Sequence, residues 1–288
     1  MHPHIILLAE TGSDITPELA KENGIYLVPM HVSMGDVTLD DGSFPPEELC
    51  SYFRRTGKTP TTSASTPYDF THVFDQIHDQ YPDHHIVHLA YSAVTTCSYQ
   101  NALLASENRP YVTSVDTKHV SVGQAAVALA AARYLDAHPD AGAEETAAFV
   151  RDIAEKTQMC FVPQSLDFLR AGGRVSNAAA MVGNLLGLHP CIEILDGKLM
   201  AQKKYRGMIK KFFPRMLADF DFKHPLDRKL LYLIQTPELE ADVMNVAEQA
   251  AAEMGFEKVV WMKTGCVITS HGGPGAIGIV GYHAGVLD

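Results

Sequence analysis

Hydroxyl side chains gather in three short polar stretches of the chain, residues 10–16, 59–66 and 92–98. Thr16 and Thr66 are each followed by a proline, which is the pattern of a helix N-cap with proline in the first turn. Hydroxyls just before a helix N-terminus can join its free N–H groups in holding a carboxylate or a phosphate. These stretches therefore predict anion-binding loops, although an ordinary loop that satisfies its own hydrogen bonds explains residues 59–66 equally well.

A single arginine follows two glycines in the middle of the chain, at Gly172, Gly173 and Arg174. Two residues without Cβ can close a helix through a left-handed turn, and they also leave room beside Arg174 for an anion or another protein. A second glycine-rich stretch, residues 270–282, contains His271. We expect His271 to be exposed in a turn, where a lone histidine is structural more often than functional.

Several other sites can be excluded from the motifs. The glycines after His271 match the spacing of a dinucleotide-binding fingerprint, but residues 277–280 predict a strand where that fingerprint needs a helix. The histidines at 78, 84, 85 and 88 have no recurrent ligand spacing, so we expect surface residues and no metal. No nucleophile elbow, Walker motif or general base stands out. The hydroxyls, Arg174 and His271 thus predict recognition of an anionic head group without catalysis.

Composition limits the partners. The net charge of −11, with no cluster of basic residues beyond a solvated helix face at 203–215, argues against a nucleic-acid partner. The five cysteines are widely spaced and include no CxxC pair, which indicates a reduced compartment. The apolar run at 5–8 is too short for a signal peptide, and no apolar run is long enough to span a membrane. We therefore expect a cytoplasmic protein.

The apolar runs predict an α/β protein of two domains, residues 1–156 and 157–288. In the first, strands at 5–9, 25–30, 86–90 and 111–115 alternate with helices, as in a parallel doubly wound sheet. Residues 37–66 are expected to form loops around one helix at 47–55. In the second, a mixed sheet is expected from a hairpin about Asp196 and Gly197 and strands at 230–235, 258–262 and 277–280. Ser176 predicts the N-cap of a helix over residues 178–186.

Five motifs in order resemble the DegV family, and the similarity runs nearly end to end. They are Ala9 to Ile15, Thr62-Ser63, Ser92 to Gln100, Gly172 to Arg174, and His271 to Gly275. The resemblance implies two α/β domains with a long-chain fatty acid held between them and no other cofactor. It also implies a lipid-binding protein, not an enzyme, that presents the fatty acid to a separate fatty acid kinase for acyl-phosphate formation. Transient contact with a membrane is compatible with that role.

The resemblance also assigns roles to residues. It implies that hydroxyls of Thr62, Ser63, Ser92 and Thr96 hold the carboxylate, with Arg174 and His271 nearby. The sequence departs from the family pattern at Ala93 and Cys97, where serine and glycine are typical, and at Glu10, where aspartate is typical. Two alternatives stay open: an enzyme or phosphotransfer subunit acting on a small anionic substrate, and a binding protein for another amphiphile.

Overall fold

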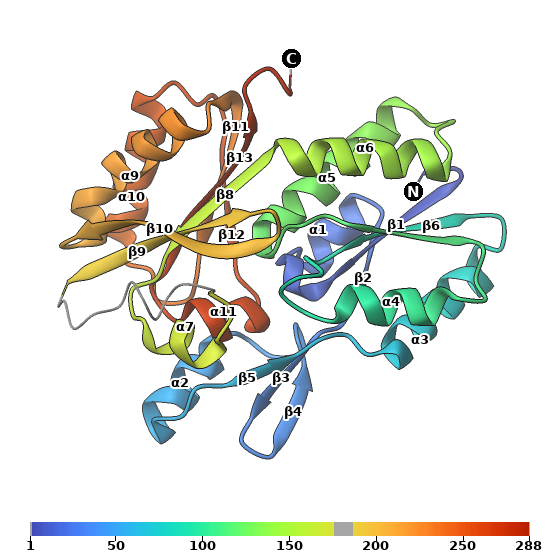
Figure 1. The fold of residues 1–288 in the computed structure, drawn as a ribbon, viewed down its shortest axis with the longest axis horizontal. Helices are drawn as coiled ribbons and strands as arrows, with labels where there is room; N and C mark the ends of the chain where they lie inside the picture. Colours follow the sequence, from blue (N-terminus) through green and yellow to red (C-terminus); the bar gives the residue numbers. More distant parts are fainter. Residues whose placement is uncertain (1, 176–186, 288) are drawn as a thin grey trace.

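Four parallel strands form the sheet of the N-terminal half. The computed structural model describes residues 2–175 and 187–287, and Figure 1 shows how the elements are arranged. The strand order is β2-β1-β6-β7, with bounds β1 Ile5–Glu10, β2 Ile25–Val28, β6 His85–Ala90 and β7 Val112–Asp116. This order reverses direction between β1 and β6, so the loops after these two strands meet at a topological switch point. The predicted parallel sheet is confirmed.

Both faces of this sheet are buried, and successive residues of a strand contribute to opposite faces because their side chains point to opposite sides. Ile6 and Leu8 pack beneath α3 (Pro67–Gln80) and α4 (Ser98–Ser106). Their neighbours Leu7 and Ala9 belong to the core shared with α5 (Ser121–Ala137) and α6 (Ala143–Lys156). The helix α1 (Pro17–Glu22) links β1 to β2. The N-caps Thr16 and Thr66 form as predicted, each accepting a backbone N–H three residues ahead.

A small antiparallel sheet replaces the loops expected between residues 30 and 66. Its strand order is β4-β3-β5, with bounds β3 His31–Met34, β4 Val37–Asp40 and β5 Thr61–Ser63. The helix α2 (Glu47–Thr56) lies between β4 and β5 in the sequence. The strands are short and mostly exposed, so they lack the apolar alternation by which a strand is recognised. The prediction that residues 59–66 form only a loop was therefore wrong for β5.

The C-terminal half contains a mixed sheet of six strands, ordered β10-β9-β8-β13-β11-β12. The bounds are β8 Thr157–Val162, β9 Leu188–Leu195, β10 Lys198–Arg206, β11 Leu226–Gln235, β12 Val259–Lys263 and β13 Ile277–His283. Only β11 and β12 pair in parallel among the described strands of this sheet. The helices α9 (Ile209–Lys223) and α10 (Ala241–Glu253) cover one face (Figure 1). The predicted fold class is confirmed.

The alanine-rich helix α5 joins the two halves. It contacts β1 and β6 of the first sheet and also β8 and β13 of the second. The helix is buried around almost its whole circumference, and its small alanine side chains let both sheets approach its backbone closely. A single core cluster therefore runs from Leu7 to Tyr282, and the domain boundary between residues 156 and 157 stays a prediction.

Two local predictions have different outcomes. The hairpin between β9 and β10 turns through Asp196 and Gly197, both with positive φ, which confirms the predicted Asp-Gly turn. The predicted cap Ser176 and helix 178–186 lie outside the described residues. No helix within the described ranges is both long and apolar enough to cross a membrane.

Candidate ligand-binding site

A cavity lies between the two large sheets and the small one, with about 890 Å³ of atom-free space including its mouth. The deeper lining is apolar and comes from both halves of the chain; it includes Met30, Val120, Met159, Phe161, Ile234 and Ala276. Polar side chains are added by β5, by the loop after β6, and by Arg174 and His271, among others. The combination of an apolar interior and a few polar groups suits an amphiphilic ligand.

The hydroxyl of Thr62 meets the imidazole of His271 in this cavity. Thr62 Oγ1 lies 2.8 Å from His271 Nε2. His271 is in the last turn of α11 (Cys266–Gly272) and is largely covered, so the prediction of an exposed turn histidine was wrong. The following glycines suggested a turn, whereas residues 266–269 begin a helix. The sequence also showed no pair of a nucleophile and a base, but the Thr62–His271 distance is one that such a pair would have.

Burial decides the charge of His271. Desolvation lowers its pKa to about 4, and the nearby positive charge of Arg174 acts in the same direction. The ring is therefore neutral at neutral pH, and its Nδ1 is buried without a hydrogen-bond partner among the described residues. A neutral ring has one N–H, so Nε2 either donates to the Thr62 hydroxyl or accepts from it according to the tautomer.

Glycines allow α11 to pack against α7 (Asp167–Gly172). The left-handed φ of Gly173 ends α7, as predicted. A Cβ added at Gly172 would overlap His271 Nδ1, and one added at Gly273 would lie 2.8 Å from Phe168 Cδ2. Both glycine motifs therefore serve the close packing of α7 against α11 (Figure 1). The contact with Gly172 places His271 beside the end of α7.

Arg174 stands at the exposed side of the cavity, just after this turn. Its Nη1 donates to the Gly172 carbonyl at 2.7 Å, which folds the side chain back over the end of α7. Ser63, on β5, is likewise exposed and lines the cavity. By contrast, Met159, Ile234 and Ala276 are at most 4 % exposed. The cavity is thus polar where it meets solvent and mainly apolar inside, where Ser121, Thr236 and Thr264 are buried polar residues of the lining.

The loop after β6 contributes only part of what was expected. Thr96 lines the cavity, but Ser92 does not belong to the lining. The Ser92 hydroxyl is fully buried and donates to the Gly197 carbonyl at 2.8 Å. It ties this loop to the hairpin of the other half, so the structure does not bring Ser92 together with Thr62, Ser63, Thr96, Arg174 and His271.

Two aspartates missed from the sequence hold α11 in place. Asp14 Oδ1 accepts the Gly265 N–H and Asp41 Oδ1 accepts the Cys266 N–H, both at 2.7 Å. Burial raises the pKa of both carboxyls. Their bonds satisfy N–H groups at the start of the helix that carries His271. A signal was present for Asp14, which stands in the first polar stretch.

The histidines expected on the surface divide into two kinds. His78 stacks on Tyr111, and His85 Nε2 is 2.8 Å from Thr113 Oγ1, both on partly covered surface. His88 is fully buried and lies 3.4 Å from Glu10, so its surface prediction was wrong. Among residues 2–175 and 187–287, no cluster of His, Cys, Asp or Glu could hold a metal ion.

Fold and cavity define an α/β protein with two large sheets, a small third sheet and an internal cavity. A family model described as "Uncharacterised protein, DegV family" matches residues 4–283. The chain therefore belongs to the DegV family, which confirms the resemblance found in its five motifs.

Relatives extend over almost the whole chain. A DegV domain-containing protein of Caldanaerobacter subterraneus is 28 % identical over 280 residues, covering 96 % of this chain and 97 % of the relative. A fatty acid-binding protein of Thermotoga maritima is 26 % identical, covering 94 % and 95 %. A solved structure described as fatty acid binding of a DegV family protein from Thermus thermophilus superposes with a TM-score of 0.87 at 28 % identity, covering 98 % of this chain and all of the other.

Proposed function

We propose that this protein binds a long-chain fatty acid, with the acyl chain in the apolar cavity and the carboxylate at its polar mouth. The single observation that carries the proposal is one cavity with a buried, mainly apolar interior and a polar rim. Burial of an acyl chain supplies about 0.8 kcal/mol per methylene, so the interior accounts for most of the affinity. The fatty-acid-binding descriptions of the Thermotoga and Thermus relatives support this assignment.

The rim has donors suited to a carboxylate. Thr62 and His271 form a hydrogen-bonded pair, Ser63 and Thr96 add hydroxyls, and Arg174 adds a fixed positive charge. Hydrogen bonds to an ionised acceptor are stronger than neutral ones, so these groups orient the ligand head outward. Ser92 is left out of this set because its hydroxyl is occupied by Gly197.

The outward-facing head group has a consequence for partners. A carboxylate near Ser63 and Arg174, both exposed, is accessible to a second protein while its acyl chain stays buried. We propose that the chain presents the fatty acid to a separate fatty acid kinase and does not itself catalyse a reaction. On this proposal the only bound small molecule is the fatty acid.

A second candidate rests on the Thr62–His271 contact. Its 2.8 Å separation suits a nucleophile and base acting on a small anionic substrate. The apolar interior favours the carrier, because a small anion gains nothing from it. Incubation of the purified protein with candidate esters and phosphoesters, followed by product analysis, separates the two: turnover that is lost in Thr62→Val supports the enzyme.

Ligand discrimination tests the carrier directly. Thermal denaturation is measured with palmitate, methyl palmitate and acetate. Palmitate should raise the melting temperature, methyl palmitate should raise it less because the rim loses its anion, and acetate should have no effect. Equal shifts for palmitate and its methyl ester would contradict carboxylate recognition, and no shift with either would contradict fatty-acid binding.

A further inference from the structure

The loop from Tyr91 to Ser98 is short, yet it lines the cavity with three of its side chains. Tyr91, Thr95 and Thr96 all contribute to the lining. The Thr95 hydroxyl is occupied, since it donates to the Ser92 carbonyl at 2.9 Å. Among the described residues, Thr96 Oγ1 accepts only a long contact of 3.4 Å, from the Ser98 N–H. Within this loop, Thr96 is therefore the hydroxyl best placed to meet a ligand.

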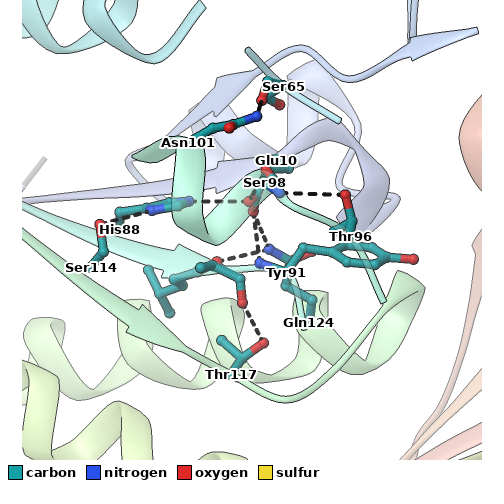
Figure 2. A network of polar contacts seen from close by, with 12 residues as sticks. Glu10, Ser65, His88, Tyr91, Thr96, Ser98, Asn101, Ser114, Thr117 and Gln124 are labelled. Atoms are coloured by element: carbon teal, nitrogen blue, oxygen red, sulfur yellow. Dashed lines mark hydrogen bonds and ion pairs between the residues drawn. The ribbon is translucent and has the colours of Figure 1, made fainter. Parts of the chain in front are cut away.

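One carboxylate bonds to both ends of this loop. Glu10 Oε2 accepts the Tyr91 N–H at 2.9 Å, and Glu10 Oε1 accepts the Ser98 hydroxyl at 2.7 Å (Figure 2). Glu10 is the last residue of β1 and is fully buried. The phenol ring of Tyr91 points away from Glu10, on the side where Thr96 lies (Figure 2). Glu10 thus anchors both ends of the loop whose side chains face the cavity.

The remaining bonds of Glu10 hold it in one position. Gln124 Nε2 donates to Oε2 at 2.7 Å and also to the Leu89 carbonyl. On the other side, His88 Nε2 is 3.4 Å from Oε1, and His88 Nδ1 is 3.1 Å from Ser114 Oγ. A buried carboxylate needs such partners to stay ionised. Through His88 and Gln124, its position is fixed by β6 and α5 as well as by β1.

We propose that Glu10 is a positioning residue that sets the 91–98 loop and thereby places Thr96 at the head group of the ligand. This inference rests on the proposed fatty-acid function.

Two single-hydroxyl variants of the same network provide a matched test. Ser98→Ala removes the hydrogen bond between Glu10 and the loop end, whereas Ser114→Ala removes a hydroxyl that, within the described residues, bonds only to His88. We expect the Kd for palmitate to rise about five- to tenfold in Ser98→Ala, as for the loss of one hydrogen bond. It should change less than about twofold in Ser114→Ala.

Hydrogen exchange without ligand reports on the loop itself. Amides of residues 92–97 should exchange faster in Ser98→Ala than in wild type or Ser114→Ala, while the strands keep their protection. Equal exchange and equal palmitate affinity in the two alanine variants would overturn the role of Glu10. If wild type bound no palmitate but the loop loosened only in Ser98→Ala, the fatty-acid function would fall and the loop anchoring by Glu10 would stand.

Discussion

Thr62 Oγ1 and His271 Nε2 lie 2.8 Å apart, although 209 residues separate them in the sequence. Thr62 belongs to β5 of the small sheet, and His271 ends α11 in the C-terminal half. The polar rim is therefore completed only when both halves of the chain pack together. Asp14 and Asp41 secure that packing, because they bond to the start of α11 from the N-terminal half.

Replacing the Thr62 hydroxyl should weaken fatty-acid binding with little effect on stability. Thr62→Val keeps the shape and the β-propensity of the side chain but removes its hydrogen bond. A hydrogen bond to a charged group contributes roughly 1.5–3 kcal/mol, so we expect the Kd for palmitate to rise about 10- to 100-fold by isothermal titration. The control is Thr61→Val, because Thr61 lies next in β5 but outside the cavity lining. Equal affinities in the two variants would refute the role of Thr62.

Adding a methyl group at Gly172 should disturb the same rim from a distance. The new Cβ would overlap His271 Nδ1, so the ring or the end of α7 must move. We expect Gly172→Ala to bind palmitate several-fold more weakly and to melt at a lower temperature. Gly142→Ala is the matched control, since Gly142 has nothing within 4 Å of an added Cβ and a φ of −83°. Unchanged palmitate binding in Gly172→Ala would show that the position of His271 is irrelevant to the ligand.

The neutral state of His271 should make stability depend on pH. Burial lowers its pKa in the folded protein to about 4, against an ordinary value of 6.5. As pH falls through 6.5, the unfolded chain gains a proton that the folded protein does not bind, so the free energy of unfolding falls until pH nears 4. From about pH 7 to about pH 5 this loss should be roughly 2 kcal/mol for His271.

Urea denaturation of His271→Gln measures that contribution. The variant should lose less stability than wild type over the same pH range, by about the amount given above. A residual loss is expected in both proteins, because burial also lowers the pKa of His119 to about 4. Identical pH dependence of wild type and His271→Gln would show that His271 is protonated equally in the folded and unfolded states.

Filling the interior should select shorter ligands. Ala276 is 3 % exposed and lines the cavity. In Ala276→Leu the added carbons should occupy part of the cavity that the acyl chain would fill. The protein should then prefer a fatty acid that is shorter by roughly three carbons. Competition between saturated fatty acids of different lengths, read by mass spectrometry of the bound lipid, measures the shift. An unchanged length preference would place the acyl chain elsewhere.

The sequence was informative where chemistry and local pattern coincide. Buried strands such as β1 and β6, the capped helix after Thr66 and the Asp196–Gly197 turn each carry a short-range signal, and all formed as predicted. Of the predicted site residues, Thr62, Ser63, Thr96, Arg174 and His271 line one cavity. Their roles toward a ligand stay predictions, because the geometry alone does not show a bound head group.

The misses depend on contacts between distant segments. In the sequence, Ser92 cannot be distinguished from the other hydroxyl residues of its loop, yet it donates a hydrogen bond to Gly197, 105 positions further along the chain. Glu10 reads as an altered loop residue, but its burial follows from the meeting of β1, β6 and α5. The strand β5 is visible only through its pairing with β3, in which Thr62 faces Val32. None of these partners can be read from local periodicity.

The most direct test of the fatty-acid assignment is mass spectrometry of the protein purified without added lipid, under native and then denaturing conditions. The proposal predicts a native mass that exceeds the chain mass by one fatty acid, and release of that fatty acid on denaturation. An empty protein that also shows no thermal stabilisation by palmitate or oleate would contradict it.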